Sequence, residues 1–430
     1  MRRFEMPSGS SERILAKNTL FLYVMQVSGY VFPLLTFPYL TRVLGAERYG
    51  TVVFANAVMQ YFSMLIEFGF ILSATKTCSE RRGDKSALGE VTFCVIGGKL
   101  LLALLGAVLL AACCALSRNF RKDAVFFVLS YAGIVLSAFL PDFLFRGIEQ
   151  MGVITYRVIL SKAVYTAAIF VLVRSPSDYM LVPAATIAAN LVAVVLSWIE
   201  IRRRGLIVPA KVTAGEIFRH LKESSVFFLS RVAVSLYSTL NTVLLGFRFS
   251  ESALGQYGAA NGLTNTCRSM LSPISDSLYP YLVNRKNFAL VRKVLLVLEP
   301  VIVAGCVLLW FIAAPVIRIV CGEGYGGAVP VFRAMLPLVV ISLPTYLFGY
   351  PVLGALDRVR VANTSVIAGS AFHVAGLFVL HFCGRLDFMS VPLLTFATEV
   401  VVFAIRAGTV AKVYAEKRDG ASAMEGDLLK

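Results

Sequence analysis

The sequence predicts an all-α polytopic membrane protein with about twelve transmembrane helices, arranged as two pseudo-symmetric six-helix lobes. Two observations support this fold class. Hydrophobic residues make up 58% of the 430 residues and charged residues only 15%, and the mean hydropathy is +0.76. A soluble chain of this length has no interior large enough for so many apolar side chains, so the bilayer must be its solvent. In addition, a short phrase occurs twice, about 208 residues apart, and divides the apolar segments into two similar sets.

Apolar stretches of about 20 residues mark the predicted helices, because a helix of that length crosses the hydrocarbon layer. The twelve stretches begin near residues 18, 50, 91, 124, 153, 179, 224, 253, 291, 329, 359 and 387. No connection between them exceeds about 25 residues, which leaves no room for an extramembrane catalytic domain. The sequence also lacks a GxxxxGK[ST] loop and a DxD motif. We therefore expect neither an enzyme nor an ATP-driven pump, and we expect no metal or organic cofactor.

The repeated phrase is Leu-Gly followed closely by Tyr-Gly, at residues 44–50 and again at residues 254–258. Its spacing places a boundary in the basic connection near residue 205, which predicts an N-lobe of residues 1–205 and a C-lobe of residues 206–430. Six spans in each lobe, an even number, give both lobes the same orientation in the membrane. The lobes should therefore be related by an axis along the bilayer normal, as in parallel-repeat transporters whose pathway lies between the halves.

Basic residues predict the orientation of the chain. With both termini in the cytoplasm, most of the 41 Lys and Arg residues fall on the cytoplasmic side, and the strongest marker is Arg202-Arg203-Arg204. The opposite orientation violates the positive-inside rule. The net charge of +16 then reflects topology and attraction to anionic membrane lipid, and nucleic acid is not an expected partner.

Several charged residues fall inside the predicted spans. The basic ones are Lys99, Lys162, Arg231, Arg268 and Arg333. The acidic ones are Glu67, Asp142, Asp276, Glu299 and Glu399. A central charge costs roughly 2.5–3.5 kcal/mol on the insertion scale, so five cations facing lipid would cost on the order of 15 kcal/mol. That sum exceeds a typical net folding stability. The cations must therefore pair with acids or line a wet cavity.

Arg231 and Arg268 are the main candidates for a cavity that faces an anionic substrate. A guanidinium group presents a fork of donors that matches phosphate, and it keeps its charge inside a membrane. For Arg268, an ion pair with Asp276, eight residues later, is the alternative. Lys99 and Lys162 either face the cavity or pair with a neighbouring acid. Arg333, near the outer surface, can extend to the headgroups.

Two carboxylates and one histidine are candidates for ion handling. Glu67 and Asp276 lie at nearly equivalent repeat positions, and an embedded carboxylate can exchange protons or bind Na⁺. A salt bridge from Glu67 to Lys76 or Arg82 is the structural alternative. His373, in the middle of a predicted span, has two alternative roles: packing or hydrogen bonding within the protein, or proton handling. The eight cysteines form no CxxC motif and are interpreted as small buried residues.

Four stretches resemble a known family. They are Thr36–Gly50, the Glu67-Phe68-Gly69 motif with Arg81-Arg82 behind it, Phe145–Met151, and Ser272-Pro273 with Tyr279-Pro280. Together they resemble the bacterial O-antigen and polysaccharide (Wzx-type) flippases of the multidrug/oligosaccharidyl-lipid/polysaccharide (MOP) exporter superfamily. The family pattern commonly has Gln before Gly147-Ile148-Glu149, where this chain has Arg146. That departure adds a cation near the predicted inner mouth.

The resemblance implies a two-lobed MATE-like fold and a flippase of a bacterial or archaeal cytoplasmic membrane. Its implied substrate is an O-antigen, capsule or exopolysaccharide repeat unit on undecaprenyl pyrophosphate, which moves from the inner to the outer leaflet by alternating access. A cationic cavity and coupling to an H⁺ or Na⁺ gradient are implied too, as are polysaccharide polymerase and chain-length proteins as partners. The residues assigned to the cavity are Arg231, Arg268, Lys99, Lys162 and Arg146, and those assigned to ion coupling are Glu67 and Asp276.

Two other functions stay open at this point. A MATE-type multidrug or cation exporter would share the fold, but a cavity for cations should offer carboxylates rather than arginines. A membrane-embedded polysaccharide polymerase or ligase is the alternative from another class. Such enzymes carry a large external loop with catalytic charges, and the longest connection here is predicted to be cytoplasmic.

Overall fold

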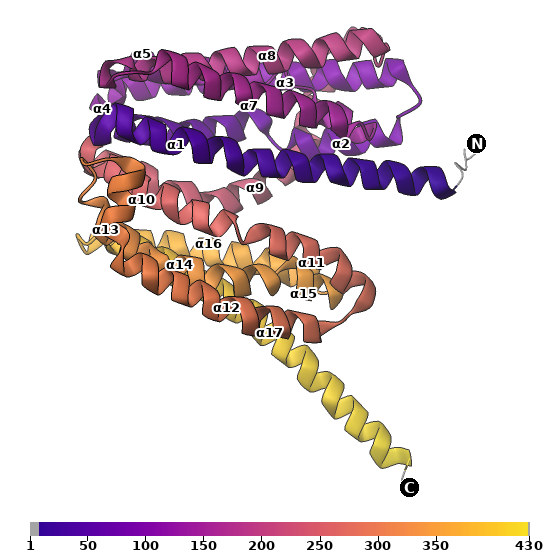
Figure 1. The fold of residues 1–430 in the computed structure, drawn as a ribbon. Helices are drawn as coiled ribbons and strands as arrows, with labels where there is room; N and C mark the ends of the chain where they lie inside the picture. The colour runs from indigo at the N-terminus through magenta and orange to yellow at the C-terminus, as the bar shows by residue number, and fades with distance from the viewer. Residues whose placement is uncertain (1–7, 429–430) are drawn as a thin grey trace. The chain divides into compact units, whose positions relative to one another are not determined.

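The computed structural model describes residues 8–428 of the chain, and it describes side chains in residues 18–228 and 239–416. Over these ranges the secondary structure is helical, without strands (Figure 1). The first helices are α1 (Ser8–Glu67), α2 (Phe70–Glu80), α3 (Lys85–Leu116), α4 (Arg118–Lys122), α5 (Ala124–Ser137), α6 (Asp142–Gly147), α7 (Met151–Leu172), the 3₁₀ turn η1 (Pro176–Met180) and α8 (Leu181–Arg204). The later ones are α9 (Ala214–Arg248), α10 (Glu251–Ser269), α11 (Ser272–Arg285), α12 (Phe288–Phe311), α13 (Ala313–Cys321), α14 (Ala328–Leu347), α15 (Tyr350–Ala355), α16 (Val359–Phe382) and α17 (Ser390–Leu428).

Nine helical segments of the described residues are long and apolar enough to cross a membrane, fewer than the twelve predicted. Two predicted spans form the single kinked helix α1, because Gly45 has a non-helical backbone with φ 67° and ψ 171° that glycine adopts at little cost. The other two segments missing from the nine are α9, whose central residues 229–238 lie outside the range in which side chains are described, and α10, which is rich in Gly, Asn and Thr. All twelve predicted segments lie on described helices, and twelve crossings stay a prediction.

Large apolar side chains lie exposed along the helices. On α3, Leu104 and Val108 are 66% and 61% exposed, and on α12, Leu296 and Val301 are 65% and 64% exposed. Soluble monomers rarely carry apolar patches larger than a few hundred Å². These faces suit acyl chains, which confirms a multi-pass membrane protein.

Contacts divide the chain into two units, Met1–Val232 and Ala233–Lys430. The division falls inside α9, later than the predicted boundary at residue 205. The beginning of α9 belongs with unit 1 because it packs against α2, where Ser224 Oγ lies 2.6 Å from Ser73 Oγ. The contact-based boundary therefore follows packing, whereas the predicted one follows the basic connection along the chain.

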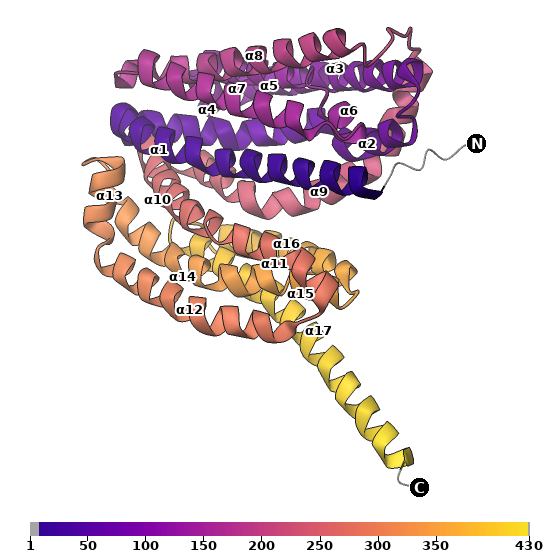
Figure 2. The ribbon, with the colours of Figure 1, turned by 45° about the vertical axis from the view of Figure 1, so that its right-hand side comes forward.

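The two units repeat one order of helices. The break at Gly45 in α1 is matched by the break between α9 and α10. A six-residue helix, α6 or α15, precedes the last two long helices of each unit. The packing repeats as well: α2 contacts α6 as α11 contacts α15, and α5 contacts α8 as α14 contacts α17 (Figures 1 and 2). This order supports the repeat inferred from the sequence.

A second feature of the repeat is an ion pair that follows each six-residue helix. Glu149 and Asp357 have positive φ angles of 60° and 57°, which few residues other than glycine adopt. Glu149 Oε1 lies 2.9 Å from Arg82 Nη2, and Asp357 Oδ2 lies 3.7 Å from Lys286 Nζ. The same unusual backbone and the same charge pairing thus occur at matching places in the two units.

Gly147, the last residue of α6, lets this helix lie against α2. A Cβ atom at this position would lie 2.5 Å from Cys78 Cβ and 3.0 Å from the Thr75 carbonyl oxygen. We expect Gly147→Val to lower the free energy of unfolding by about 1–3 kcal/mol, because the backbone oxygen cannot move aside. Thermal unfolding of the purified protein in detergent measures the effect. Gly83→Ala is the matched control, since no atom lies within 4 Å of its Cβ position; equal melting temperatures for the two variants would contradict this packing.

Candidate functional site

A pocket of about 650 Å³ lies inside unit 1, lined by the end of α1 and by α2, α3, α5 and α6. Three predicted site residues, Glu67, Lys99 and Arg146, line it together with Asp142. The rest of the lining is apolar or carries hydroxyl groups: Ile71, Leu72, Thr75, Ser137, Leu140 and Phe143. The structure therefore brings together charged residues that the sequence placed in separate segments.

Lys99 and Glu67 form an ion pair in this pocket. Lys99 Nζ lies 2.9 Å from Glu67 Oε2, and the two side chains are 3% and 28% exposed. The ammonium group also lies 5.9 Å from the centre of the Phe143 ring. Because Lys99 is almost fully enclosed, the carboxylate of Glu67 is what makes its charge tolerable there.

The sequence analysis offered Lys76 or Arg82 as the salt-bridge partner of Glu67, and that prediction is wrong. Lys76 pairs with Glu80 at 4.0 Å, and Arg82 pairs with Glu149 at 2.9 Å. Both cations lie on the far part of α2 or in the loop after it, where carboxylates nearer to them are available. Lys99 thus takes the alternative that the sequence left open, an ion pair with a neighbouring acid.

A second ion pair joins Asp142 to Arg157 of α7. Arg157 Nη2 donates one charge-assisted hydrogen bond of 2.9 Å to Asp142 Oδ2, and Nη1 lies 2.7 Å from Oδ1 without forming a second hydrogen bond. The Arg157 side chain is only 3% exposed. The sequence analysis did not single out Arg157, because it lies in the first turns of a predicted span. The sequence did contain one sign of its importance: Arg157 lies five residues before Lys162, inside the same apolar segment.

Arg146 contributes a further positive charge to the pocket. Its guanidinium lies beyond 4 Å of every described carboxylate, and its buried Nε has no hydrogen-bond partner among the described residues. With Arg157 included, three cations (Lys99, Arg146 and Arg157) stand against two carboxylates (Glu67 and Asp142), which leaves one net positive charge. The pocket is less cationic than the sequence suggested, and Arg146 is the cation that a ligand can meet.

Lys162 lies elsewhere in unit 1 and does not line this pocket. It is half-buried on α7, and its Nζ lies 3.6 Å from the Cβ position of Gly29 on α1. None of the carboxylates in the described part of the chain lies within 4 Å of it. Its predicted role in a cavity therefore stays a prediction.

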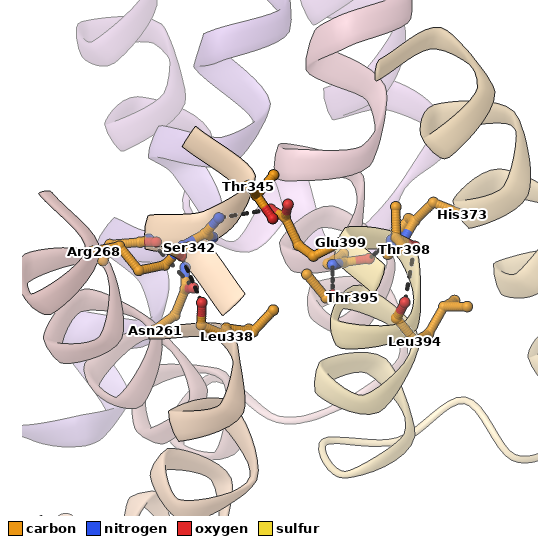
Figure 3. Close-up of polar contacts among 12 residues, drawn as sticks. Asn261, Arg268, Leu338, Ser342, Thr345, His373, Leu394, Thr395, Thr398 and Glu399 are labelled. Carbon is orange, nitrogen blue, oxygen red and sulfur yellow. Dashed lines mark hydrogen bonds and ion pairs between the residues drawn. The ribbon is translucent and has the colours of Figure 1, made fainter. Parts of the chain in front are cut away.

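Unit 2 contains a comparable ion pair. Arg268 Nη2 on α10 lies 2.6 Å from Glu399 Oε1 on α17, and Arg268 Nε donates a hydrogen bond of 2.8 Å to Ser342 Oγ on α14 (Figure 3). The Arg268 and Glu399 side chains are 18% and 6% exposed. Asp276, proposed from the sequence as the partner of Arg268, is exposed on α11. The observed carboxylate is 131 residues from Arg268, so proximity in the sequence could not identify it.

Three other arginines lie in the helical segments, and the structure describes the surroundings of two of them. The side chain of Arg231 lies outside the described residues. Arg333 donates from Nε to the Trp310 carbonyl and stacks 4.8 Å from the centre of that ring. Arg406, which the sequence analysis did not single out, is 8% exposed and donates to the Thr345 carbonyl at 2.7 Å.

Metal-binding geometry is absent from the part of the chain that the structure describes. Among these residues, no group of three or more His, Cys, Asp or Glu side chains could hold a metal ion.

Comparisons with known proteins identify the family. Residues 15–285 match the family described as "Polysaccharide biosynthesis protein". The chain belongs to this polysaccharide biosynthesis family. A relative from Escherichia coli (strain K12), named "Putative O-antigen transporter", is 31% identical over 85% of this chain and 90% of its own length. One from Shigella dysenteriae with the same name is 24% identical over 91% of this chain and 100% of its own length.

Solved structures similar to this family member show the fold. A lipid II flippase, MurJ, in an inward closed conformation has a TM-score of 0.69 at 13% identity, over 92% of this chain and 87% of that one. An inward-facing multidrug resistance MATE transporter of the MOP superfamily has a TM-score of 0.65 at 13% identity, over 93% and 99%. The MATE-like fold that the sequence resemblance implied is confirmed.

A second pocket of this polysaccharide biosynthesis family member, of about 720 Å³, lies between α1, α7 and α8. The charged residues that line it are Arg82, Glu149, Arg157, Glu200 and Arg204, of which Arg82 pairs with Glu149 and Arg204 with Glu200. Phe21, Ile148, Gly152, Val153, Tyr156, Leu196 and Ile199 supply much of the remaining wall. Arg157 lines this pocket, whereas its partner Asp142 lines the first one. The Arg157–Asp142 ion pair therefore lies between the two pockets.

The ion pair between Arg82 and Glu149 makes the stability of this family member depend on pH. The hydrogen bond from Arg82 lowers the pKa of Glu149 below its ordinary value of about 4.3. The pair therefore stabilises the folded protein above about pH 4.3, and this contribution is lost as the pH falls through the lower folded pKa. Because Glu149 is 49% exposed, we expect less than about 1 kcal/mol.

We expect the melting temperature of Glu149→Gln to be slightly lower than that of wild type at pH 7 and equal to it near pH 3. Arg82→Gln should remove the same pH dependence. Thermal unfolding of both variants at the two pH values checks this, and a difference from wild type that is as large at pH 3 as at pH 7 would exclude the pair as its origin.

Proposed function

We propose that the protein is a flippase for a lipid-linked oligosaccharide, an O-antigen or other polysaccharide repeat unit on undecaprenyl pyrophosphate. It moves this substrate from the inner to the outer leaflet of a bacterial cytoplasmic membrane by alternating access. The observation that carries the proposal is the 31% identity to an O-antigen transporter over 85% of this chain. The fold, shared with exporters of the MOP superfamily, supports a transporter rather than an enzyme.

The unit 1 pocket supplies a site for the pyrophosphate. Arg146 presents a guanidinium group whose charge no described carboxylate takes up, and a guanidinium matches phosphate oxygens in charge and geometry. Lys99 is adjacent but committed to Glu67 at 2.9 Å. The pocket can hold one anionic group at Arg146 without breaking either ion pair, and a second anionic oxygen would compete with Glu67 for Lys99.

Proton or sodium coupling follows from this competition. Protonation of Glu67 removes the partner of Lys99 and raises the net charge of the pocket by one. A proton would thus strengthen binding of the anion, and the anion would strengthen binding of the proton by the same factor. Glu67 is therefore our preferred coupling residue, with Asp276 as the candidate in unit 2; Na⁺ in place of the proton would act through the same carboxylates.

The second pocket supplies an entry for the lipid-linked substrate. Its apolar wall, including Phe21, Tyr156 and Ile199, suits a polyprenyl chain, and a phosphate would compete with Glu149 for Arg82 and with Glu200 for Arg204. In the proposed orientation, with both termini in the cytoplasm, this pocket opens at the inner leaflet. The Arg157–Asp142 pair separates it from the Arg146 pocket, so opening this pair would let the headgroup pass.

A MATE-type cation exporter is the second candidate, because its fold is the same. The charge around the unit 1 pocket disfavours it, since Arg157 neutralises Asp142 from outside the lining and Lys99 neutralises Glu67, which leaves Arg146 as an uncompensated cation. Polysaccharide polymerase and chain-length proteins are proposed as partners outside the membrane pathway, since they consume the flipped product.

The experiment that tests the proposal is deletion of the gene in its own host. A flippase predicts that lipid-linked repeat units accumulate inside the cell and that surface polysaccharide is lost, and re-expression of the gene reverses both. Sensitivity to ethidium, a cationic exporter substrate, should not change. Normal surface polysaccharide together with increased ethidium sensitivity would instead identify a cation exporter.

A further inference from the structure

His373 lies in the middle of α16 and is 0% exposed. Both ring nitrogens face side chains of other helices. Nδ1 lies 2.8 Å from Thr398 Oγ1 on α17, and Nε2 lies 2.8 Å from Asn241 Oδ1 on α9. Figure 3 shows the ring beside Thr398, close to the Arg268–Glu399 pair but not part of it. A buried imidazole held at both nitrogens has its proton positions fixed by what its neighbours donate.

The hydrogen bond at Nε2 has one direction. Asn241 Nδ2 donates to Thr395 Oγ1 at 3.1 Å, and the Thr395 hydroxyl in turn donates to the Val391 carbonyl at 2.8 Å. The Asn241 amide is therefore oriented with its oxygen toward the histidine. Since that oxygen only accepts, Nε2 carries a hydrogen and donates it.

The hydrogen bond at Nδ1 can run in either direction. The Thr398 hydroxyl lies 2.8 Å from His373 Nδ1 and also 2.8 Å from the Leu394 carbonyl oxygen, and its single hydrogen can serve only one of them. If the hydroxyl donates to Nδ1, the imidazole is neutral. If it donates to Leu394, its oxygen accepts a hydrogen from Nδ1, and the ring is a cation. Both states keep both ring nitrogens hydrogen-bonded.

We propose that His373 is a proton-binding site in unit 2, at which rotation of the Thr398 hydroxyl accommodates the bound proton. When the proton arrives, Nδ1 gains an N–H bond, the Thr398 hydrogen turns to the Leu394 carbonyl, and Nδ1 becomes the donor to Thr398 Oγ1. The only covalent bond formed is the N–H bond, and the ring gains one positive charge. The same steps in reverse release the proton.

The surroundings make this proton sensitive to conformation. The described charged and titratable groups on α16 and on the helices beside it are Arg248 on α9, Tyr350 on α15, Arg360 and His381 on α16, and Glu399, Arg406, Lys412, Tyr414 and Glu416 on α17. The first turns of α9, in unit 1, also carry Glu216, Arg219, His220, Lys222 and Glu223. Glu399 is next to Thr398 in sequence, and it is held by Arg268 at 2.6 Å. Arg406 is about two turns further along α17 and adds positive charge.

A buried positive charge is costly unless a carboxylate or water compensates it. A conformation that admits water to His373, or that frees Glu399 toward it, therefore binds the proton more tightly than the one described. The proton in turn favours that conformation. Coupling of this step to lipid movement rests on the proposed function, whereas the proton site itself does not.

Nitrogen-15 NMR of histidine-labelled protein in nanodiscs tests the proposal directly. The chain has only three histidines, at positions 220, 373 and 381, so His373→Gln assigns the signal by its disappearance. As the pH falls from 9 to 4, we expect the His373 signal to change from neutral with hydrogen on Nε2 to doubly protonated. A signal that keeps one protonation state while that of the exposed His381 titrates would overturn the proposal, with no consequence for flippase activity.

Two variants shift the titration in opposite directions. Asn241→Asp places a carboxylate at Nε2 and should move protonation to higher pH by at least one unit. Thr398→Val keeps the shape but removes the oxygen that accepts from Nδ1, and should move protonation to lower pH by a comparable amount. A His373 titration that neither variant moves would show that the proton is not held by this network, and would also overturn the proposal.

Discussion

Replacing Glu67 with glutamine is expected to lower the free energy of unfolding by about 3–5 kcal/mol, because it leaves the Lys99 ammonium group buried without its carboxylate. Lys99 is 3% exposed, so the lysine cannot reach water in exchange for the lost partner. Equilibrium unfolding in mixed detergent micelles measures the difference from wild type.

The reverse change should cost less. In Lys99→Met the Glu67 side chain, which is 28% exposed and lines the pocket, is left without its partner, and the methionine leaves Oε2 open to water from the pocket. The double variant Glu67→Gln with Lys99→Met removes both charges, and it should be more stable than either single variant, within about 1 kcal/mol of wild type. Additive losses in the double variant would contradict the ion pair.

Arg146→Glu is expected to reduce transport at least tenfold while the protein still folds. The change replaces the cation available to an anionic ligand with a third carboxylate beside Glu67 and Asp142. Loss of one charge-assisted hydrogen bond to phosphate corresponds to about 1.5–3 kcal/mol, which is roughly 10- to 100-fold in binding. Flipping of labelled lipid-linked oligosaccharide by reconstituted protein measures it.

Arg146→Gln is the graded control for this result. Glutamine is the residue common in the family pattern at this position, and it retains hydrogen-bond donors. We expect a smaller loss than for the charge reversal, with an unchanged melting temperature in both variants. Equal transport by wild type, Arg146→Gln and Arg146→Glu would remove Arg146 from the substrate path.

The fold could be predicted from the sequence because its causes are local. Span length, apolar composition and the repeated Leu-Gly … Tyr-Gly phrase each act over a few residues, and the structure places helices at all twelve predicted segments. The phrase itself is explained by packing: Leu44 and Leu254 are 2% and 1% exposed, and Gly45 breaks α1. The family resemblance implied a MATE-like fold, and the similarity to solved structures shows it.

The candidate site could be predicted only in part, because charge pairing depends on contacts between distant segments. The embedded charges were recognised from their cost, but their partners were not: Lys99 meets Glu67 across 32 residues, and Arg268 meets Glu399 across 131. Arg157 was missed because a charge in the first turns of a predicted span lies near the membrane surface, where its insertion costs little free energy. Only the structure shows that α7 carries it into the protein, 3% exposed, against Asp142.

The central claim is that this chain moves a lipid-linked oligosaccharide across a bilayer. Reconstitution of the purified protein into liposomes that contain a fluorescent undecaprenyl-pyrophosphate oligosaccharide, with a membrane-impermeant quencher outside, measures this movement most directly. Wild type is predicted to expose the inner-leaflet pool to the quencher, faster with an imposed proton gradient, and Arg146→Glu to resemble protein-free liposomes. If the inner-leaflet lipid is equally protected from the quencher in wild-type and protein-free liposomes, under both proton and sodium gradients, the chain is not a flippase for this lipid.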